Sequence, residues 1–258
     1  MTHNQHLIIG TGKLGRHFYH YLSQSESKDT LITLSRSAKD WSKHQIIADL
    51  HDAKWSLPPI THLAQVTIIV APDARDEANY QHTYIQLVTN LVTELKKQHR
   101  DFHVTFVSST SVYAAEQLGI ITEATTPKPE SFSGKILLQA EQNLMSLHQS
   151  VSIIRPSGLY SSNRQRLIDS LLDKKQYHNP KWLNLIHEQD LCQWINFVSE
   201  KKIPLSIASD GSPFQRQQLQ DAANGQEPQS ISPERCLHST YLTQVNLTYP
   251  SIFSWLKL

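Results

Sequence analysis

At 258 residues the chain is long enough to bury a full hydrophobic core, in one large domain or two closely joined ones. Its 24 basic and 23 acidic residues leave a net charge of +1 without basic blocks or acidic tails, which argues against nucleic acid as a partner. No apolar run approaches the roughly 18 residues of a membrane-spanning helix, so we expect no membrane partner. Without a signal-peptide pattern, we expect a cytoplasmic protein in which Cys192 and Cys236 are free thiols.

A short apolar run at residues 7–9 is followed at once by a glycine-rich turn and then by an amphipathic segment at residues 16–23. In this context of strand, turn and helix, a Gly-x-Gly-x-x-Gly pattern predicts dinucleotide binding. The first glycine permits the sharp turn, the second lets the backbone approach a pyrophosphate, and the third lets the helix pack closely on the strand. The alternative is an ordinary tight turn of another α/β protein. The turn consists of Gly10, Thr11, Gly12, Lys13, Leu14 and Gly15.

The rest of the first half alternates strand and helix patterns. A continuous apolar run at residues 66–71 is typical of a strand buried on both faces, and apolar residues at helical spacing indicate helices over 80–98 and 135–147. This alternation predicts an α/β fold with a Rossmann-type doubly wound parallel sheet, whose ligand lies at the carboxyl ends of the strands. Further strands are expected at residues 31–34, 45–48, 104–107 and 151–154.

After Arg155 the pattern is less regular. We therefore divide the chain into a dinucleotide-binding Rossmann core, residues 1–155, and a small substrate lobe with returning elements, residues 156–258, packed on the core as one unit. In the second part Asp210 or Ser212 is expected to cap a helix. The expected elements are helices over 164–175, 190–199 and about 213–223, strands at 182–186 and 205–208, and a polar loop at 224–235.

The end of the second strand bears on the choice of cofactor. A Rossmann unit that binds NAD usually carries an acidic residue there, bonded to the ribose 2′-hydroxyl. Here Ser35 and Arg36 occupy this place and no carboxylate follows. A guanidinium suits a 2′-phosphate, so we predict NADP, with NAD as the less favoured choice. The alternative is that Arg36 is a solvated surface residue, with Lys39 as a second solvated charge nearby.

Three longer segments share a pattern when taken together. Residues 107–113 read Val-Ser-Ser-Thr-Ser-Val-Tyr, residues 155–160 read Arg-Pro-Ser-Gly-Leu-Tyr, and residues 184–191 read Asn-Leu-Ile-His-Glu-Gln-Asp-Leu. In this order they resemble the extended short-chain dehydrogenase/reductases, the nucleotide-sugar epimerase and dehydratase family. The resemblance covers most of the chain.

This resemblance implies roles for individual residues. Thr110 falls on the catalytic Ser/Thr position, and Glu123 on the acidic residue of the following loop. Asp49 and Leu50 match the pair that contacts the adenine, and the segment from Arg155 corresponds to the one beside the nicotinamide.

The chain departs from the family at the catalytic pair. The family has Tyr-x-x-x-Lys at the start of the helix after the fifth strand. One alignment places Ser133 on the tyrosine and Leu137 on the lysine, and the other places Ser131 on the tyrosine and Lys135 on the lysine. Because the phenol transfers the proton, the usual hydride-transfer chemistry loses its acid–base group. The glycine spacing differs too, and both features resemble the small atypical bacterial members called YeeZ-like.

These observations lead to two hypotheses about function. The first is an NADP-dependent oxidoreductase or epimerase acting on a small or nucleotide-sugar-like substrate. The alternative is a catalytically inactive dinucleotide-binding sensor or regulatory protein. The helices near 80–98 and 135–148 pair in related proteins, so a homodimer is possible.

The candidate residues form three groups, and no metal site is predicted because no set of ligands has suitable spacing. The catalytic candidates are Thr110, Tyr113, Ser133 and Lys135, although Tyr113 also fits a core tyrosine beside the sheet and Lys135 a solvated helix residue. The substrate candidates are Tyr160, Arg164, His187 and Phe214. The cofactor candidates are Gly10, Thr11, Gly12, Lys13, Leu14, Gly15, Ser35, Arg36, Asp49, Leu50, Ala71, Pro72, Ser108, Ser109, Arg155, Pro156, Ser157 and Gly158.

Overall fold

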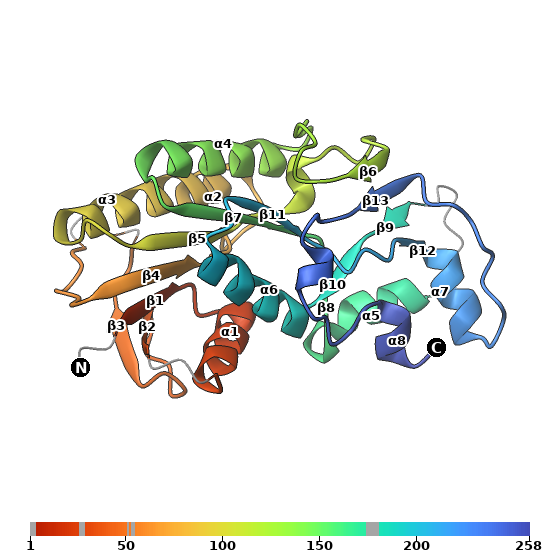
Figure 1. The fold of residues 1–258 in the computed structure, drawn as a ribbon, viewed down its shortest axis with the longest axis horizontal. Helices are drawn as coiled ribbons and strands as arrows, with labels where there is room; N and C mark the ends of the chain where they lie inside the picture. The colour runs from red at the N-terminus through yellow and green to blue at the C-terminus, as the bar shows by residue number, and fades with distance from the viewer. Residues whose placement is uncertain (1–3, 26–28, 51, 53–54, 174–180) are drawn as a thin grey trace.

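The structure is a computed structural model that describes residues 4–25, 29–50, 52, 55–173 and 181–258 (Figure 1). Its centre is a parallel sheet of seven strands in the order β11-β7-β5-β4-β1-β2-β3. The order reverses between β1 and β4, so the predicted doubly wound Rossmann-type sheet is confirmed. The strands of this sheet are β1 (Gln5–Ile9), β2 (Thr30–Ser35), β3 (His44–Ile47), β4 (Leu63–Ile68), β5 (His103–Val107), β7 (Val151–Pro156) and β11 (Leu205–Ala208).

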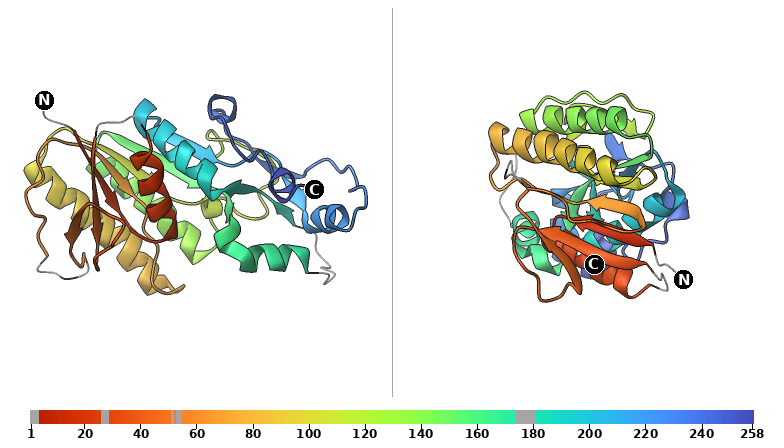
Figure 2. Two further views of the ribbon diagram at one scale, coloured as in Figure 1. Left: turned by 90° about the horizontal axis from the view of Figure 1, so that it is seen from below. Right: turned by 90° about the vertical axis from the view of Figure 1, so that its left-hand side faces the viewer.

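Helices cover both faces of the sheet, and every residue of β5 and β7 is therefore buried. Figure 1 shows α3 and α4 above the sheet and α1 and α6 below it, and the end-on view in Figure 2 shows the same layers. The single helix predicted over 80–98 consists of three consecutive segments with a π-helical turn in the middle. The bounds are α1 (Lys13–Ser23), α2 (Glu77–Tyr80), the π-helix η1 (Gln81–Leu87), α3 (Val88–Gln98), α4 (Phe132–Leu147) and α6 (Glu188–Lys201).

A small lobe extends beyond the carboxyl end of the sheet (Figure 2). Its core is formed by buried apolar residues, including Tyr160 and Phe214. The chain returns from the lobe to the core, because α6 and β11 follow Arg155 in the sequence but belong to the layers of the sheet. The division into two parts at residue 155 stays a prediction. The other elements are β6 (Gly119–Ile121), β8 (Gly158–Tyr160), β9 (Trp182–Leu183), β10 (Leu185–His187), β12 (Phe214–Gln215), β13 (Arg235–Leu237), α5 (Gln165–Leu172), α7 (Arg216–Ala223), α8 (Ile252–Leu256) and the 3₁₀ turns η2 (Thr110–Val112), η3 (Ser162–Arg164) and η4 (Leu242–Gln244).

Three predictions about the lobe were wrong. The strand expected at 182–186 is two strands, because the chain changes partner at Asn184: β9 pairs antiparallel with β12, and β10 pairs parallel with β8. The helix expected from about residue 213 begins at Arg216, since the preceding residues pair with β9. Asp210 and Ser212 do not cap this helix, because the Asp210 carboxylate accepts the Ser212 backbone N–H at 2.9 Å. The end of the helix predicted over 164–175 falls outside the described residues.

Close backbone contact at two glycines fixes the position of α1 on the sheet. A Cβ on Gly15 would lie 1.9 Å from the carbonyl oxygen of Gly10, and a Cβ on Gly10 would lie 2.0 Å from that of Ile69. Gly10 also has a φ of +91°, a conformation that side chains disfavour. Around Gly12, by contrast, a Cβ would meet no atom within 4 Å. The first and third glycines are therefore required by packing, and the second leaves open space.

This difference predicts that substitutions at Gly15 and Gly12 change the free energy of unfolding by different amounts. We expect Gly15→Ala to lower the free energy of unfolding by about 2 kcal/mol or more, because backbone must move to admit the methyl group. We expect Gly12→Ala to stay within about 1 kcal/mol of wild type, since its methyl group enters open space. Denaturant unfolding followed by circular dichroism measures both, and equal losses in the two variants would contradict this account of the turn.

Candidate functional site

A pocket of about 500 Å³ lies at the carboxyl edge of the sheet, beside the point where strand order reverses. Its walls come from the glycine turn, the ends of β2 and β3, the segment after β4, and the π-helix η1. Thr83 and Leu87 of η1 reach it, and π-helical turns are frequent at functional sites. The pocket brings together half of the predicted cofactor residues: Gly10, Thr11, Gly12, Ser35, Arg36, Asp49, Leu50, Ala71 and Pro72.

The start of α1 has the properties of an anion-binding helix N-terminus. Gly12 is the N-cap residue and supplies no side-chain hydrogen bond to the first turn, which also contains no acidic residue. The first N–H groups of the helix and its dipole therefore favour a negatively charged group there. The space above Gly12 is where a Cβ would project, so the turn fits the pyrophosphate of a dinucleotide.

Two cations lie at the end of β2, and two carboxylates of the pocket, Asp73 and Asp49, act on Arg36. Arg36 donates from both terminal nitrogens to Asp73, at 2.7 and 2.8 Å, across the pocket from the segment after β4. The Lys39 ammonium donates to Ser37 Oγ at 2.8 Å and also lines the pocket. Sequence reasoning missed Asp73, which is 37 residues from Arg36 in the chain. More than half of each side chain of the Arg36–Asp73 pair is exposed, so a competing anion could displace this carboxylate at small cost.

Thr110 stands at the start of η2, immediately after the carboxyl end of β5. Its hydroxyl donates to the carbonyl oxygen of Pro156 at 3.2 Å, and its side chain is half-buried. Two predicted cofactor residues before it have internal roles, since Ser109 Oγ accepts the Ser111 N–H and Ser108 Oγ donates to Glu141 at 2.5 Å.

Tyr113 lies in a buried polar network beneath this turn. The Tyr113 phenol oxygen accepts a hydrogen bond from Arg155 Nη1 at 2.7 Å. Arg155 also donates from Nε and Nη2 to the carboxylate of Glu141, and all three side chains are buried. Burial raises the pKa of Tyr113. These contacts agree with the second interpretation of Tyr113, a core tyrosine beside the sheet. They also direct the Arg155 guanidinium into the interior.

The first turn of α4 contains the other catalytic candidates. Ser131 is its N-cap and accepts the Gly134 N–H at 3.1 Å, and Ser133 Oγ lies 3.0 Å from Ser131 Oγ. A Cβ on Gly134 would lie 2.2 Å from the carbonyl oxygen of Ser111, so α4 packs directly against the turn that carries Thr110. Lys135 is exposed. The sequence has no tyrosine between Tyr113 and Tyr160, so no phenol follows β5 on α4.

Three of the four predicted substrate residues lie in the interior of the lobe. Tyr160 is fully buried and packs edge-on against His187 with ring centroids 5.1 Å apart, while Phe214 packs against Phe253. Burial lowers the pKa of His187 to about 4, so this imidazole is neutral at pH 7 and accepts the Gln189 N–H on Nδ1 at 3.2 Å. Among the described residues, no group forms a hydrogen bond with the hydroxyl of Tyr160. Of the predicted cofactor residues that follow Arg155, Ser157 is buried, whereas Gly158 is exposed and pairs with Leu185.

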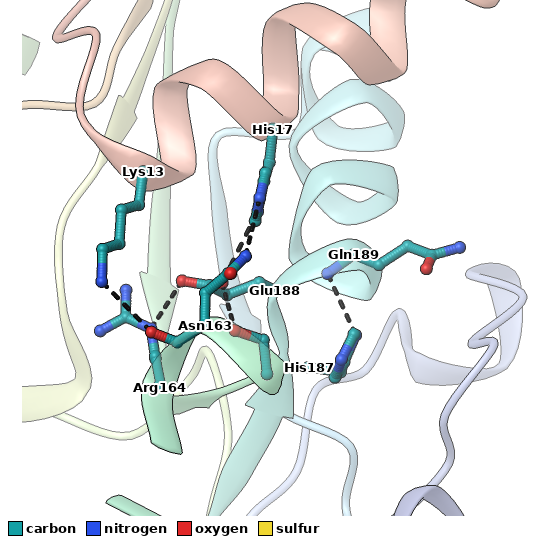
Figure 3. Close-up of polar contacts among 8 residues, drawn as sticks. Lys13, His17, Asn163, Arg164, His187, Glu188 and Gln189 are labelled. Carbon is teal, nitrogen blue, oxygen red and sulfur yellow. Dashed lines mark hydrogen bonds and ion pairs between the residues drawn. The ribbon is translucent and has the colours of Figure 1, made fainter. Parts of the chain in front are cut away.

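The fourth predicted substrate residue, Arg164, belongs to η3 and lies beside the start of α1 (Figure 3). Its Nε donates to Oε1 of Glu188 at 2.6 Å, and Ser161 Oγ donates to Oε2 at 2.5 Å. The Glu188 side chain is 1% exposed, although nothing in the sequence pattern singled it out as part of a site.

Two residues of α1 complete this polar cluster. The Lys13 ammonium donates to the carbonyl oxygen of Asn163 at 3.2 Å. His17, one turn further along, lies with Nε2 3.3 Å from Asn163 Nδ2 and with Nδ1 3.6 Å from Glu188 Oε2. The glycine-turn helix and the lobe are thus joined directly (Figure 3).

Glu123 forms hydrogen bonds with both the sheet and the last segment of the lobe. Its carboxylate accepts hydrogen bonds from the Ile207 N–H on β11 and from Ser239 and Thr240. Burial alone would raise the pKa of Glu123, but these hydrogen bonds outweigh it and lower the pKa. In this chain the acidic residue of the family motif therefore holds two distant segments together.

Within the described residues, no three His, Cys, Asp or Glu side chains are grouped as metal ligands would be. Among these same residues, no helix is both long and apolar enough to span a membrane.

Comparison with known proteins adds to this geometry. Residues 5–193 match the model of the RmlD substrate binding domain. The chain belongs to this family. The match covers the glycine turn, the predicted catalytic positions and the start of α6. The comparison with curated proteins gives no match.

Solved structures extend the likeness to the whole chain. A candidate NAD-dependent epimerase/dehydratase from Methylobacillus flagellatus is 26% identical, with a TM-score of 0.75 over 99% of this chain and 97% of that one. A dTDP-glucose 4,6-dehydratase from Bacillus anthracis in complex with NAD is 15% identical, with a TM-score of 0.72 over 95% and 92%. A UDP-glucuronic acid 4-epimerase from Bacillus cereus in complex with NAD is also 15% identical, with a TM-score of 0.73 over 95% and 94%.

These relatives confirm the predicted resemblance to epimerase/dehydratase-like proteins. At 15% identity the last two structures show the fold alone. The narrower YeeZ-like grouping stays a prediction.

The buried network gives a testable consequence for stability. Because removing one partner of a buried ion pair leaves an uncompensated charge, we expect Glu141→Gln and Arg155→Met each to lower the free energy of unfolding by about 3 kcal/mol or more. The double variant should lose less than the sum of the two, which a double-mutant cycle by denaturant unfolding measures. Strictly additive losses would show that the pair contributes no coupling.

Proposed function

We propose that this protein binds a nicotinamide dinucleotide in the pocket at the carboxyl edge of the sheet. The observation that carries the proposal is the space above Gly12, open at the uncapped start of an eleven-residue helix and continuous with a pocket that ends at Arg36. The pyrophosphate would lie on the glycine turn, and Asp49 and Leu50 would contact the adenine. The bound cofactor would supply hydride transfer, and the dehydratase and epimerase structures named above hold NAD.

NADP is the form that we propose. Arg36 and Lys39 supply two cations, and Ser35 and Ser37 supply hydroxyl groups, at the place that receives the adenosine ribose. A 2′-phosphate could accept a bidentate pair of hydrogen bonds from Arg36 in place of Asp73. Asp73 opposes this choice, since its carboxylate competes for Arg36 and could accept a hydrogen bond from the 2′-hydroxyl of NAD.

For the substrate we propose a small or nucleotide-sugar-like molecule, in line with the dTDP-glucose and UDP-glucuronic acid enzymes that share the fold. Thr110 follows β5, where the substrate and nicotinamide would meet. Its hydroxyl would turn from the carbonyl oxygen of Pro156 and donate its one proton to the reacting carbonyl or hydroxyl group. Ser133 and Lys135, on the turn of α4 packed against the Thr110 turn, are the remaining candidates for proton transfer. We assign Tyr113 to positioning because its phenol is held by Arg155.

A second function, dinucleotide binding without turnover, is favoured by one observation. The start of α4 supplies no phenol, and the phenol of Tyr113 is buried in a hydrogen bond. A sensor or regulatory protein needs only the glycine turn, the pocket and a lobe that responds. A homodimer through α3 and α4, which lie side by side on one face of the sheet, also stays a proposal (Figure 1).

Titration calorimetry with NADPH and NADH tests the cofactor. We expect tighter binding of NADPH, and Arg36→Ala should weaken NADPH binding by about tenfold or more while changing NADH little. Asp73→Asn should strengthen NADPH binding by about fivefold, since it removes a competing negative charge. Gly12→Ala should weaken both dinucleotides. If wild-type protein binds neither, the proposal fails, and unchanged preference in Arg36→Ala removes the case for NADP.

Turnover is tested with UDP- and dTDP-sugars and bound dinucleotide, by chromatography of products and by nicotinamide absorbance. If the protein is an enzyme, Thr110→Val should lower kcat by about 100-fold, because it removes a hydroxyl at the reacting group, while Thr110→Ser should retain most activity. Equal activity in Thr110→Val and Thr110→Ser would exclude this role for Thr110. Binding of dinucleotide with no product from any sugar would favour the sensor.

A further inference from the structure

Arg164 uses only part of its hydrogen-bonding capacity in the cluster of Figure 3. Its Nε is held by Glu188, whose carboxylate is itself fixed by Ser161. Within the part of the chain that the structure describes, the terminal nitrogens Nη1 and Nη2 donate no hydrogen bond, and about a third of the side chain is exposed. A guanidinium held at Nε by a buried carboxylate keeps a fixed orientation while two N–H edges stay available.

The surroundings of these free donors carry excess positive charge. Lys13 contacts Asn163, the residue next to Arg164, and Figure 3 shows the two cationic side chains on the same side of the cluster. One buried carboxylate, Glu188, pairs with Arg164, and the first turn of α1 has no acidic residue. Two cations, one carboxylate and a helix amino terminus together favour an anion.

The location selects which anion. Lys13 is the residue after Gly12, so the cluster borders the open space at the start of α1. We infer that Arg164 is a diphosphate-binding residue that the lobe contributes to the dinucleotide site. This inference rests on the proposed function, because the diphosphate is that of the dinucleotide lying on the glycine turn.

The contact would have a consequence for the two parts of the molecule. Arg164 belongs to η3, beyond β8, whereas the glycine turn belongs to the core. A diphosphate held by backbone N–H groups of α1 and by Arg164 would bridge core and lobe. Glu188 acts here as a positioning residue, since it would hold Arg164 without touching the ligand.

The test uses the 258-residue protein and four probes: NADPH, ADP, adenosine and UDP. Arg164→Met removes the charged group but keeps most of the aliphatic stem, and Arg164→Lys keeps a charge. Arg166→Met is the matched control, because Arg166 lies two residues further along, is exposed, and its side chain forms no hydrogen bond or ion pair with the described residues. Calorimetry gives the affinity for each probe, at low and at high salt.

We expect Arg164→Met to weaken ADP and NADPH binding by about tenfold or more, because charge-assisted hydrogen bonds to phosphate are lost. Adenosine affinity should not change, since it lacks the diphosphate, and Arg166→Met should bind all probes as wild type does. Arg164→Lys should recover part of the ADP affinity. The loss of ADP affinity on adding salt should be smaller in Arg164→Met than in wild type, a difference that a purely structural role would not produce.

Four results would overturn the inference. Equal ADP affinity in wild type and Arg164→Met would show that Arg164 does not contact the diphosphate, while the proposed function would stand. A matching loss of adenosine affinity would show that the substitution distorts the site. Weaker UDP binding with unchanged ADP binding would assign Arg164 to the diphosphate of a nucleotide substrate. If wild-type protein binds neither dinucleotide nor ADP, the proposed function itself fails, and the inference with it.

Discussion

The approach of α1 to the turn after β1 is the constraint on which the site depends. Gly15 allows the helix to lie against the carbonyl oxygen of Gly10, and Gly10 lies in turn against that of Ile69 at the end of β4. These two contacts aim the amino terminus of α1 at the point where strand order reverses. The pocket, the free N–H groups and the open face of Gly12 all follow from this geometry, since a helix one side chain further away would leave them apart.

A second constraint fixes the opposite side of the site. The Glu141 carboxylate on α4 accepts hydrogen bonds from Arg155 on β7 and from Ser108 after β5, so one buried group ties three elements. Because Arg155 also holds Tyr113, the turn that presents Thr110 has a rigid foundation. The same network withdraws from the solvent a phenol that the sequence presents near the reacting position.

The sheet and the glycine turn could be predicted from the sequence because their signals are local. A strand buried on both faces appears in the sequence as a continuous apolar run, as in β5 and β7. The three glycines of the turn lie within six consecutive residues. The contacts that decide the chemistry join distant residues instead. Asp73 meets Arg36 across the pocket, and no periodicity connects a carboxylate after β4 with a guanidinium after β2. Similarly, Tyr160 and Phe214 resemble pocket residues in a loosely patterned lobe, yet they fill its core.

The contacts of the lobe bear on the choice between an enzyme and a sensor. Besides the packing of α6 and β11 on the sheet, two groups of polar contacts join elements after Arg155 to the core: Glu188 and Asn163 meet α1, and Ser239 and Thr240 meet Glu123. Only the first of these borders the dinucleotide pocket, because Lys13 follows Gly12 directly. A ligand on the glycine turn would therefore lie beside polar contacts in which His17 and Arg164 are partly exposed and Glu188 is buried. In the proposed enzyme, these contacts would hold the lobe over the substrate. In the proposed sensor, they would transmit the occupancy of the site to the lobe. The same physical connection serves both functions, so what distinguishes them is the chemistry at Thr110 and not the architecture of the site.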